Sequence, residues 1–150
     1  MEGAELKFNL TNLKNFAKQL QIKREVQVGI FEGSNRNDGK PNAEIGFKHE
    51  FGSPLEHLPM RSWLRKPIYE RGQQLAEAVN ASLEQDLSIP NAYKALAKEA
   101  EHIVEGAFAS GGYGEWKPLS DMTVANKGND TILIETGQLK NAVKAKVVKL

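Results

Sequence analysis

The sequence contains no cysteine among its 150 residues. Disulfide bonds and metal sites built from thiolates are therefore excluded, and a reducing cytosol is compatible with the chain. No window approaches the roughly 18 consecutive apolar residues of a membrane-spanning helix. The N-terminal stretch MEGAELKFNLTNLKNF also lacks the apolar run of a signal peptide. We therefore expect a soluble protein that is made in the cytoplasm and has no membrane partner.

The chain also lacks an excess of charge of either sign. Its formal net charge is +1, from 20 basic and 19 acidic residues, so bulk charge gives no indication of a nucleic-acid partner. Hydrophobic residues make up 40% and charged residues 26% of the sequence, which is typical of a globular protein with a core. The length favours a single domain over residues 1–150.

The stretch GSNRNDGK, residues 33–40, comes closest to a phosphate-binding loop, yet it lacks essential features. It has one residue too many between its glycines, and Pro41 stands where Ser or Thr would bind Mg²⁺ and a helix would begin. A phosphate cradle needs these elements together. The stretch therefore indicates a turn-rich loop, and we expect no cofactor.

The three histidines do not have the spacing of metal ligands. His49-Glu50 begins like the helix of a zinc protease, but Ser53 occupies the place of the second histidine. His57 and His102 stand at no ligand spacing, and the sequence contains no Gly-x-Ser-x-Gly nucleophile elbow. We therefore expect no metal site and no enzymatic activity. A soluble enzyme with an unrecognised site is the less favoured alternative.

Hydrophobic periodicity predicts a short helix followed by a strand near the N-terminus. The helix covers residues 9–21, because apolar residues recur there at helical spacing: Leu10, Leu13, Phe16, Ala17 and Leu20. The strand covers residues 26–31, because apolar residues alternate there with polar or small ones.

Two longer helices are predicted in the centre of the chain. The first covers residues 62–86, with Pro67 near its first turn, where a missing N–H is tolerated. The second begins after Ser88, a suitable cap, and has Pro90 near its first turn. Its buried face is expected to comprise eight residues: Tyr93, Leu96, Ala97, Ala100, Ile103, Val104, Ala107 and Phe108.

The remaining regular segments predict a small antiparallel sheet. Residues 43–51, AEIGFKHEF, fit either a strand or an extended-to-helical segment, and we assign them to the sheet with residues 26–31 and the C-terminal segment. The strands lie outside the central helical block without βαβ alternation. We therefore expect a single-domain α+β fold, with the sheet packed on the two longer helices, an N-terminal helix and a long irregular loop.

The predicted loop covers residues 109–131 and combines flexibility with a few large apolar side chains. Four glycines make it costly to order: Gly111, Gly112, Gly114 and Gly128. Its apolar residues are Tyr113, Trp116, Leu119 and Met122. Trp116 fits core packing and interface burial equally well from sequence. We expect a loop that is mobile in the isolated chain and that uses Trp116 as an anchor on a neighbouring subunit.

Residues 50–65, EFGSPLEHLPMRSWLR, combine aromatics, prolines and arginines without matching a catalytic motif. Pro59 and Pro67 bracket the entry to the first long helix. Three apolar residues are expected to pack the strands against that helix: Phe51, Trp63 and Leu64. Arg61 and Arg65 would point toward neighbouring subunits or satisfy carbonyl groups at the turn. The stretch therefore indicates a structural hinge and docking segment.

Four stretches in this order together resemble a family of tailed-bacteriophage neck and tail-completion proteins: VQVGIFEG, HEFGSPLEHLPMRSWLR, EWKPLSDMTVANKG and ILIETGQLKNAV. In that family a helix precedes a Val-Gly-Ile strand, and a Phe-Gly segment leads to a proline-rich turn with an Arg-aromatic core. A Thr-Gly-x-Leu segment follows near the end. The chain departs at Ser62 and Trp63, where the family usually has Pro-Phe, and at Ala142, where it often has serine. We also expect a short final strand.

The resemblance implies a structural virion protein, namely a tail-completion or tail-terminator subunit at the head–tail junction or the head-proximal end of the tail. It implies a hexameric ring that assembles in the host cytoplasm and contacts neck, tail-tube or head-closure proteins in the virion. The expected interface and structural residues are Phe51, Gly52, Pro59, Arg61, Trp63, Leu64, Arg65, Tyr113, Trp116, Leu119, Thr136, Gly137 and Leu139.

The C-terminal segment is rich in lysine, with no acidic residue after Glu135. Its lysines either form a solvated face or contact an acidic neighbour or DNA in the lumen: Lys140, Lys144, Lys146 and Lys149. A DNA-contacting assembly factor of the neck is therefore the first alternative function.

Overall fold

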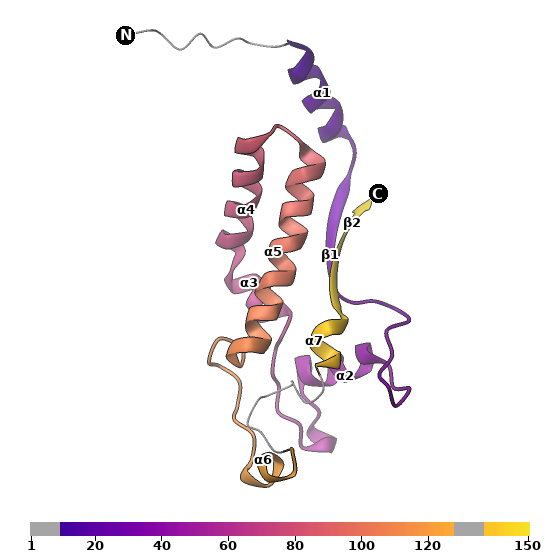
Figure 1. Cartoon of the computed structure of the whole chain (residues 1–150), viewed down its shortest axis with the longest axis vertical. Helices are drawn as coiled ribbons and strands as arrows, with labels where there is room; N and C mark the ends of the chain where they lie inside the picture. Colours follow the sequence, from indigo (N-terminus) through magenta and orange to yellow (C-terminus); the bar gives the residue numbers. More distant parts are fainter. Residues whose placement is uncertain (1–9, 128–136) are drawn as a thin grey trace, which may run out of the picture.

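The computed structural model describes residues 10–127 and 137–150. The elements in chain order are α1 (Leu10–Gln21), β1 (Arg24–Ile30), α2 (Asn42–Phe51), the 3₁₀ turn η1 (Pro54–Glu56), α3 (Arg65–Glu70), α4 (Gly72–Gln85), α5 (Ile89–Ser110), α6 (Asp121–Lys127), α7 (Gln138–Ala142) and β2 (Val143–Lys149). Figure 1 shows an elongated molecule with α1 at one end and α2 and α6 at the other. No helix in the described ranges is long and apolar enough to cross a bilayer.

The sheet is a two-stranded antiparallel ribbon. β1 pairs with β2 from Arg24 opposite Lys149 to Ile30 opposite Val143. The strand predicted at residues 26–31 is confirmed, and the final strand, expected to be short, pairs with β1 over seven residues. Apolar residues on one face of the ribbon pack against α5, which separates the ribbon from α4 in Figure 1. The α+β fold is confirmed, although the sheet covers α5 and not both long helices.

Residues 43–51 form the helix α2, so their assignment to the sheet is wrong. The reason lies in which residues face inward. Asn42, Gly46 and Glu50 recur at helical spacing and are buried, while Phe47 and Phe51 are 64% and 45% exposed. The inward stripe is polar or small, so hydrophobic periodicity does not reveal it.

The helix α5 matches its prediction closely. The Ser88 hydroxyl accepts a hydrogen bond from the N–H of Asn91, and the helix ends at Gly111, which adopts the left-handed conformation with φ 65°. Six of the eight residues predicted on its inner face are buried, and Tyr93 and Leu96 are half-buried. This helix is therefore the centre of the fold.

The predicted helix over residues 62–86 is in fact two helices. The helical conformation is interrupted at Arg71, where φ is −110° and ψ is 27°, and α4 begins at Gly72. Pro67 is buried within the first turn of α3, as expected. The Arg71 guanidinium lies 3.1 Å above the ring centre of Tyr113, so the break carries a cation–π contact.

The core cluster lies where the lower half of α5 meets the ribbon and the segment before α3. Its buried members are Trp63, Val104, Ala107, Phe108, Trp116, Leu139 and Val143. Phe108 lies between the two tryptophans, with ring centres 5.8 Å from each and an edge-on contact with Trp116. The aromatic residues of the chain's irregular segments therefore fix those segments to α5.

Candidate functional site

Glu50, at the end of α2, organises the entry to α3. Its carboxylate is buried, with 3% of the residue exposed. It accepts hydrogen bonds from the N–H groups of Trp63 at 2.9 Å, Leu64 at 2.9 Å and Arg65 at 3.2 Å. The Ser62 hydroxyl and the Arg65 side chain donate at 2.7 and 3.0 Å. A buried charge is tolerated when donors surround it, so Glu50 serves as the cap of α3 from another helix.

Arg61 is buried and is used inside the molecule. It is 5% exposed, and its Nε and Nη2 groups donate to the carbonyl of Lys117 at 3.1 and 2.9 Å. Burial lowers the pKa of the guanidinium from its ordinary value. Its own N–H donates to the His49 carbonyl at 2.7 Å. Of the two roles expected for Arg61, the structure supports the satisfaction of carbonyl groups.

Trp116 is buried in its own chain, contrary to the expectation that it is left to anchor a neighbour. It is 8% exposed, and its indole N–H donates to the Ser62 carbonyl at 3.0 Å. Gly112 leaves the space that the indole ring occupies, because a side chain there would overlap it. Residues 109–127, the described part of this predicted loop, are also less irregular than expected, since they contain the end of α5 and the helix α6; Gly128 lies outside the described residues.

The other aromatic and turn residues of the motifs have mixed environments. Phe51 does not pack the strands against the helix. The centre of its ring lies 4.6 Å from the ring centre of Phe47, and the Arg65 guanidinium carbon lies 4.2 Å from the Phe51 ring centre. Gly52 adopts φ 77°, and a Cβ atom there would lie 2.9 Å from the backbone nitrogen of Met60. Glycine is therefore required at the turn after α2.

The remaining predicted residues divide between the core and the surface. Tyr113 is 37% exposed, and its hydroxyl donates to the Ile103 carbonyl at 2.8 Å. Leu139 belongs to the core cluster, and Leu64 packs against that cluster. Gly137 precedes α7 and adopts the left-handed conformation. Pro59 and Leu119 are half-buried, and Thr136 lies outside the described residues.

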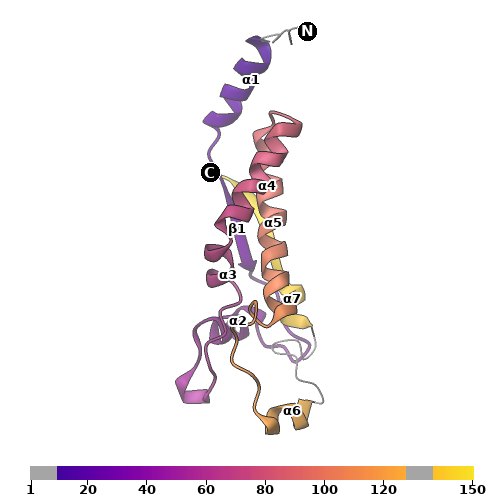
Figure 2. The same ribbon diagram turned by 90° about the vertical axis from the view of Figure 1, so that its left-hand side faces the viewer.

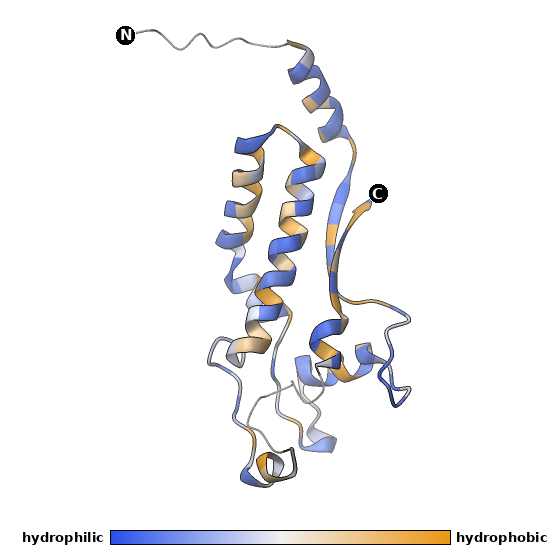
Figure 3. Ribbon diagram, in the orientation of Figure 1, coloured by the Kyte–Doolittle hydropathy of each residue, from blue (hydrophilic) through white to orange (hydrophobic). Residues whose placement is uncertain are grey.

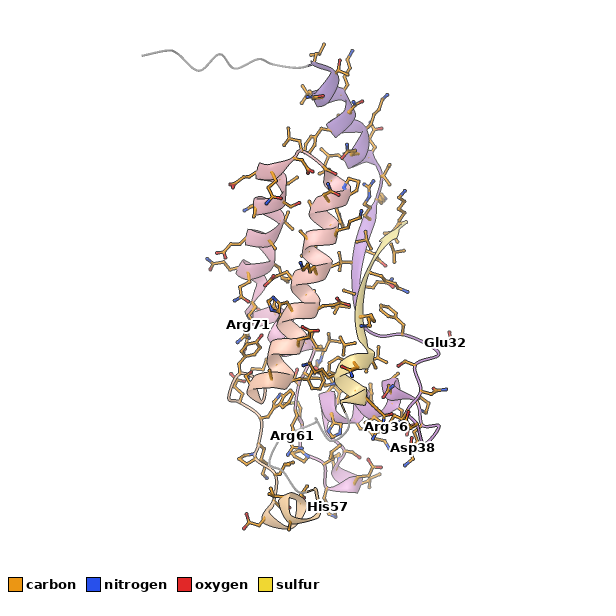
Figure 4. The ribbon with its side chains drawn as sticks, in the orientation of Figure 1. Glu32, Arg36, Asp38, His57, Arg61 and Arg71 are labelled. Carbon is orange, nitrogen blue, oxygen red and sulfur yellow. The ribbon has the colours of Figure 1, made fainter. Side chains whose placement is uncertain are left out.

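A pocket of about 470 Å³ lies at the α2–α6 end of the molecule. Its lining includes Arg36, His57, Arg61 and Lys117, and Figure 4 shows the first three in this lower region. The acidic residue in the lining is Glu56, whose carboxyl pKa is lowered by a hydrogen bond from Lys48. In the part of the chain that the structure describes, no group of three histidine or acidic residues could hold a metal ion.

The C-terminal lysines do not form one surface. Lys144 and Lys146 lie on the ribbon face opposite the core, whereas Lys149 is at odd spacing from them and lies on the other face. The Lys146 ammonium is 4.0 Å from the ring centre of Phe31. Lys140 lies in α7, before the strand. At most two of the four lysines therefore share a face of the ribbon.

Sequence reasoning missed the role of Glu50 and the contact of α2 with Trp63, whose indole N–H donates to the Gly46 carbonyl. The signal was the spacing of Asn42, Gly46 and Glu50 at four-residue intervals, which places them on one helical face. Such a face of polar and small residues is read as solvent-exposed unless its partners are known.

The four stretches that resemble the phage family meet in one place. Each stretch contributes residues to the core cluster or to the side chains packed against it. The first contributes Val28 and Ile30, the second Trp63 and Leu64, the third Trp116, and the fourth Leu139 and Val143. Segments that are distant in the sequence thus form one structural unit around Phe108. Compared with family models, with characterised proteins and with solved structures, the chain gives no match.

Proposed function

We propose that this protein is a structural virion subunit of a tailed bacteriophage, which forms a ring at the head–tail junction or at the head-proximal end of the tail. The observation that carries the proposal is the convergence of all four family-like stretches on one core. Because the four stretches belong to one structural unit, their apolar residues all serve to pack the same core.

The use of polar groups in residues 50–65 supports a structural role. The Glu50 carboxylate is occupied by backbone and side-chain donors, and the Arg61 guanidinium is occupied by carbonyl groups. Both groups hold one segment of the chain to another. In this proposal the segment fixes the geometry of the subunit and takes no part in chemistry on a substrate.

The distribution of exposed apolar residues supports assembly with other subunits. At one end of the molecule α1 exposes Leu10, Leu13 and Leu20. At the other end the exposed residues are Phe47, Phe51, Leu55 and Met60, and Leu55 is 96% exposed. A closed ring needs two different surfaces on each subunit, and exposed apolar surfaces commonly mark interfaces.

Contact with DNA is a second candidate function, favoured by one observation. Lys144 and Lys146 are exposed on the outer face of the ribbon. Glu25 shares this face and reduces its positive charge. Binding of double-stranded DNA that weakens steeply with salt, and that falls when both lysines are replaced by glutamine, would support this function.

The proposed function is tested by interrupting the gene in a phage that encodes this chain. We expect filled heads and separate tails, seen by electron microscopy, and restoration of joined particles when the purified protein is added to the lysate. Normal infectious particles from the interrupted phage would contradict the proposal.

A further inference from the structure

The pocket of about 470 Å³ at the α2–α6 end is lined by segments that are distant in the sequence. Figures 1 and 2 both show α2, α6 and α7 at this end of the molecule. Its lining includes Ile45 and His49 of α2, Lys117 from the segment before α6, and Leu139 of α7. Concave sites of this volume are typical of small-molecule binding. The pocket is therefore large enough for a small organic ligand.

Hydrogen bonds hold two walls of this pocket in place. The backbone N–H of Asn37 donates to the side-chain carbonyl of Gln138 at 2.9 Å, which connects the loop that carries Arg36 to α7. Ser53 and Leu58 exchange two backbone hydrogen bonds of 2.9 Å, which fix the turn after α2. These parts of the lining are therefore ordered without a ligand.

Arg61 contributes a buried cation to the pocket. It is 5% exposed and belongs to the lining. Its Nε and Nη2 groups donate to the carbonyls of Lys117 and Pro118, which occupy one side of the guanidinium. The Nη1 group carries two further N–H donors and forms no hydrogen bond with the described residues. These two donors are available to a ligand.

The charge of Arg61 is only partly compensated inside the protein. Among the described residues, no carboxylate forms an ion pair with its guanidinium. Burial lowers the pKa of Arg61, with no acidic group acting in the opposite direction. A buried cation is costly unless acceptors and an opposite charge surround it. The carbonyl groups supply the acceptors, and an anion beside Nη1 would supply the opposite charge.

The other charged groups of the lining make the pocket positive. Arg36 lies 3.9 Å from Asp38, an exposed carboxylate outside the lining, and Lys117 is exposed. The acidic residue of the described lining, Glu56, accepts a hydrogen bond from Lys48 at 2.9 Å. The net charge of the whole chain is only +1. The positive charge is therefore a property of this pocket and not of the protein as a whole.

Apolar side chains lie beside these charges. Ile45, Leu58, Pro59, Leu119 and Leu139 all line the pocket. Figure 3 shows both hydrophobic and hydrophilic residues in α2, α6 and α7. A ligand that combines an anionic group with an apolar body would match both parts of the lining.

We propose that this pocket binds a small organic anion. Its phosphate or carboxylate group accepts hydrogen bonds from Nη1 of Arg61, Arg36 and Lys117 attract its negative charge, and its apolar body lies against the hydrophobic lining. The planar guanidinium group suits both kinds of oxyanion. A buried arginine in a concave site favours a compact ligand over the backbone of a DNA duplex. The site goes beyond the proposed function and does not depend on ring formation.

The first test measures the binding of three probes to the purified protein by isothermal titration calorimetry: phenyl phosphate, inorganic phosphate and the neutral benzyl alcohol. We expect phenyl phosphate to bind most tightly, because it uses both parts of the lining. Inorganic phosphate should bind about tenfold more weakly, since it lacks an apolar body. Absence of phenyl phosphate binding at millimolar concentration would overturn the proposal, as would equal binding of benzyl alcohol.

The second test removes charge from the pocket. Replacing Arg61 would also remove its bonds to the Lys117 carbonyl, so the test uses Arg36→Gln combined with Lys117→Gln. The matched control is Lys94→Gln combined with Lys98→Gln, which removes the same charge from exposed positions of α5 outside the lining. We expect the pocket variant to bind phenyl phosphate about tenfold more weakly than the wild type, and the control to bind equally well. Equal weakening in both variants would show non-specific attraction and overturn the site.

The third test places the ligand beside Arg61. In nuclear magnetic resonance spectra of the ¹⁵N-labelled protein, phenyl phosphate should shift the Nε–H resonance of Arg61. The Nε–H resonance of Arg71, whose guanidinium lies over Tyr113 and outside the lining, should not move. An unchanged Arg61 resonance would overturn the assignment of its guanidinium. A short DNA duplex that displaces phenyl phosphate would overturn the small-molecule site and assign the pocket to a nucleic-acid surface instead.

Discussion

The indole N–H of Trp63 donates a hydrogen bond to the carbonyl oxygen of Gly46 at 2.8 Å. The same ring would lie 3.0 Å from a Cβ atom on Gly46, and a methyl group of Ile30 would lie equally near. A side chain at residue 46 would therefore require the Trp63 ring or the Ile30 methyl group to shift by a few tenths of an ångström. This contact joins the helix that carries Glu50 to the tryptophan whose N–H Glu50 binds.

Gly46→Ala should destabilise the protein by about 1–3 kcal/mol, the usual cost of overpacking a filled core. Alanine favours a helix by up to about 1 kcal/mol over glycine, so the steric cost must exceed this gain. Gly72→Ala is the matched control, because no described atom lies within 4 Å of its added Cβ. Chemical denaturation of both variants provides the measurement. Equal stability of the two variants would show that α2 moves freely away from Trp63.

Trp63→Ala should destabilise the fold by roughly 3–5 kcal/mol, the scale of a large aromatic truncation in a core. Trp63 is 4% exposed, so the substitution leaves a cavity against Phe108 and removes the hydrogen bond to Gly46. Tyr69→Ala, at a residue that is 87% exposed, is expected to change stability by less than about 0.5 kcal/mol. Thermal unfolding curves of the two variants should therefore differ clearly, and coincident curves would refute the assignment of Trp63 to the core.

Glu50→Gln should destabilise the protein by about 1–3 kcal/mol. The present donors share two carboxylate oxygens, whereas the glutamine amide group has only one acceptor oxygen. The side-chain NH₂ group would also face a backbone N–H. Glu44→Gln on the same helix is the control, since Glu44 is largely exposed and its ion pair with Lys48 is a surface pair. Urea denaturation at neutral pH compares them. A Glu50→Gln variant as stable as Glu44→Gln would show that the capping of α3 does not depend on the charge.

Much of this fold is predictable because its central elements obey simple local rules. The helix α5 begins at a serine cap and ends at a left-handed glycine, and its apolar stripe faces the core. Apolar residues alternate with polar or small ones in the sequence of β1, and the apolar residues of α1 lie along one side of the helix. In α5 and β1 the residues that pack against the core are apolar, whereas the stripe of α1 indicates the helix without being buried.

The candidate site was harder to predict because it depends on contacts between distant segments. Glu50 looks like a solvated helical residue until residues 62–65 wrap around its carboxylate. Arg61 receives its partners from Lys117 and Pro118, more than fifty positions away. Trp116 follows a glycine-rich segment that favours mobility locally, yet it is held by Phe108 and Ser62. The residues next to Glu50, Arg61 and Trp116 in the sequence therefore give no indication of these distant partners.

The last prediction separates the core from the interface. Trp116→Ala should lower the stability of the monomer itself by about 3–5 kcal/mol, because the residue is 8% exposed and packs edge-on against Phe108. Leu13→Glu should leave the unfolding of the monomer nearly unchanged, because Leu13 is 48% exposed and α1 buries no residue. Denaturation of dilute protein should therefore show a clear loss of stability for Trp116→Ala and almost none for Leu13→Glu. In hydrogen exchange of the monomer, the N–H groups of Gly112 and Trp116 should be protected, since they donate to the carbonyl groups of Ala107 and Gly111. If Trp116→Ala instead unfolds like the wild type but fails to assemble, Trp116 is an interface anchor after all, and the packing of this segment on α5 gives way to packing on a neighbour.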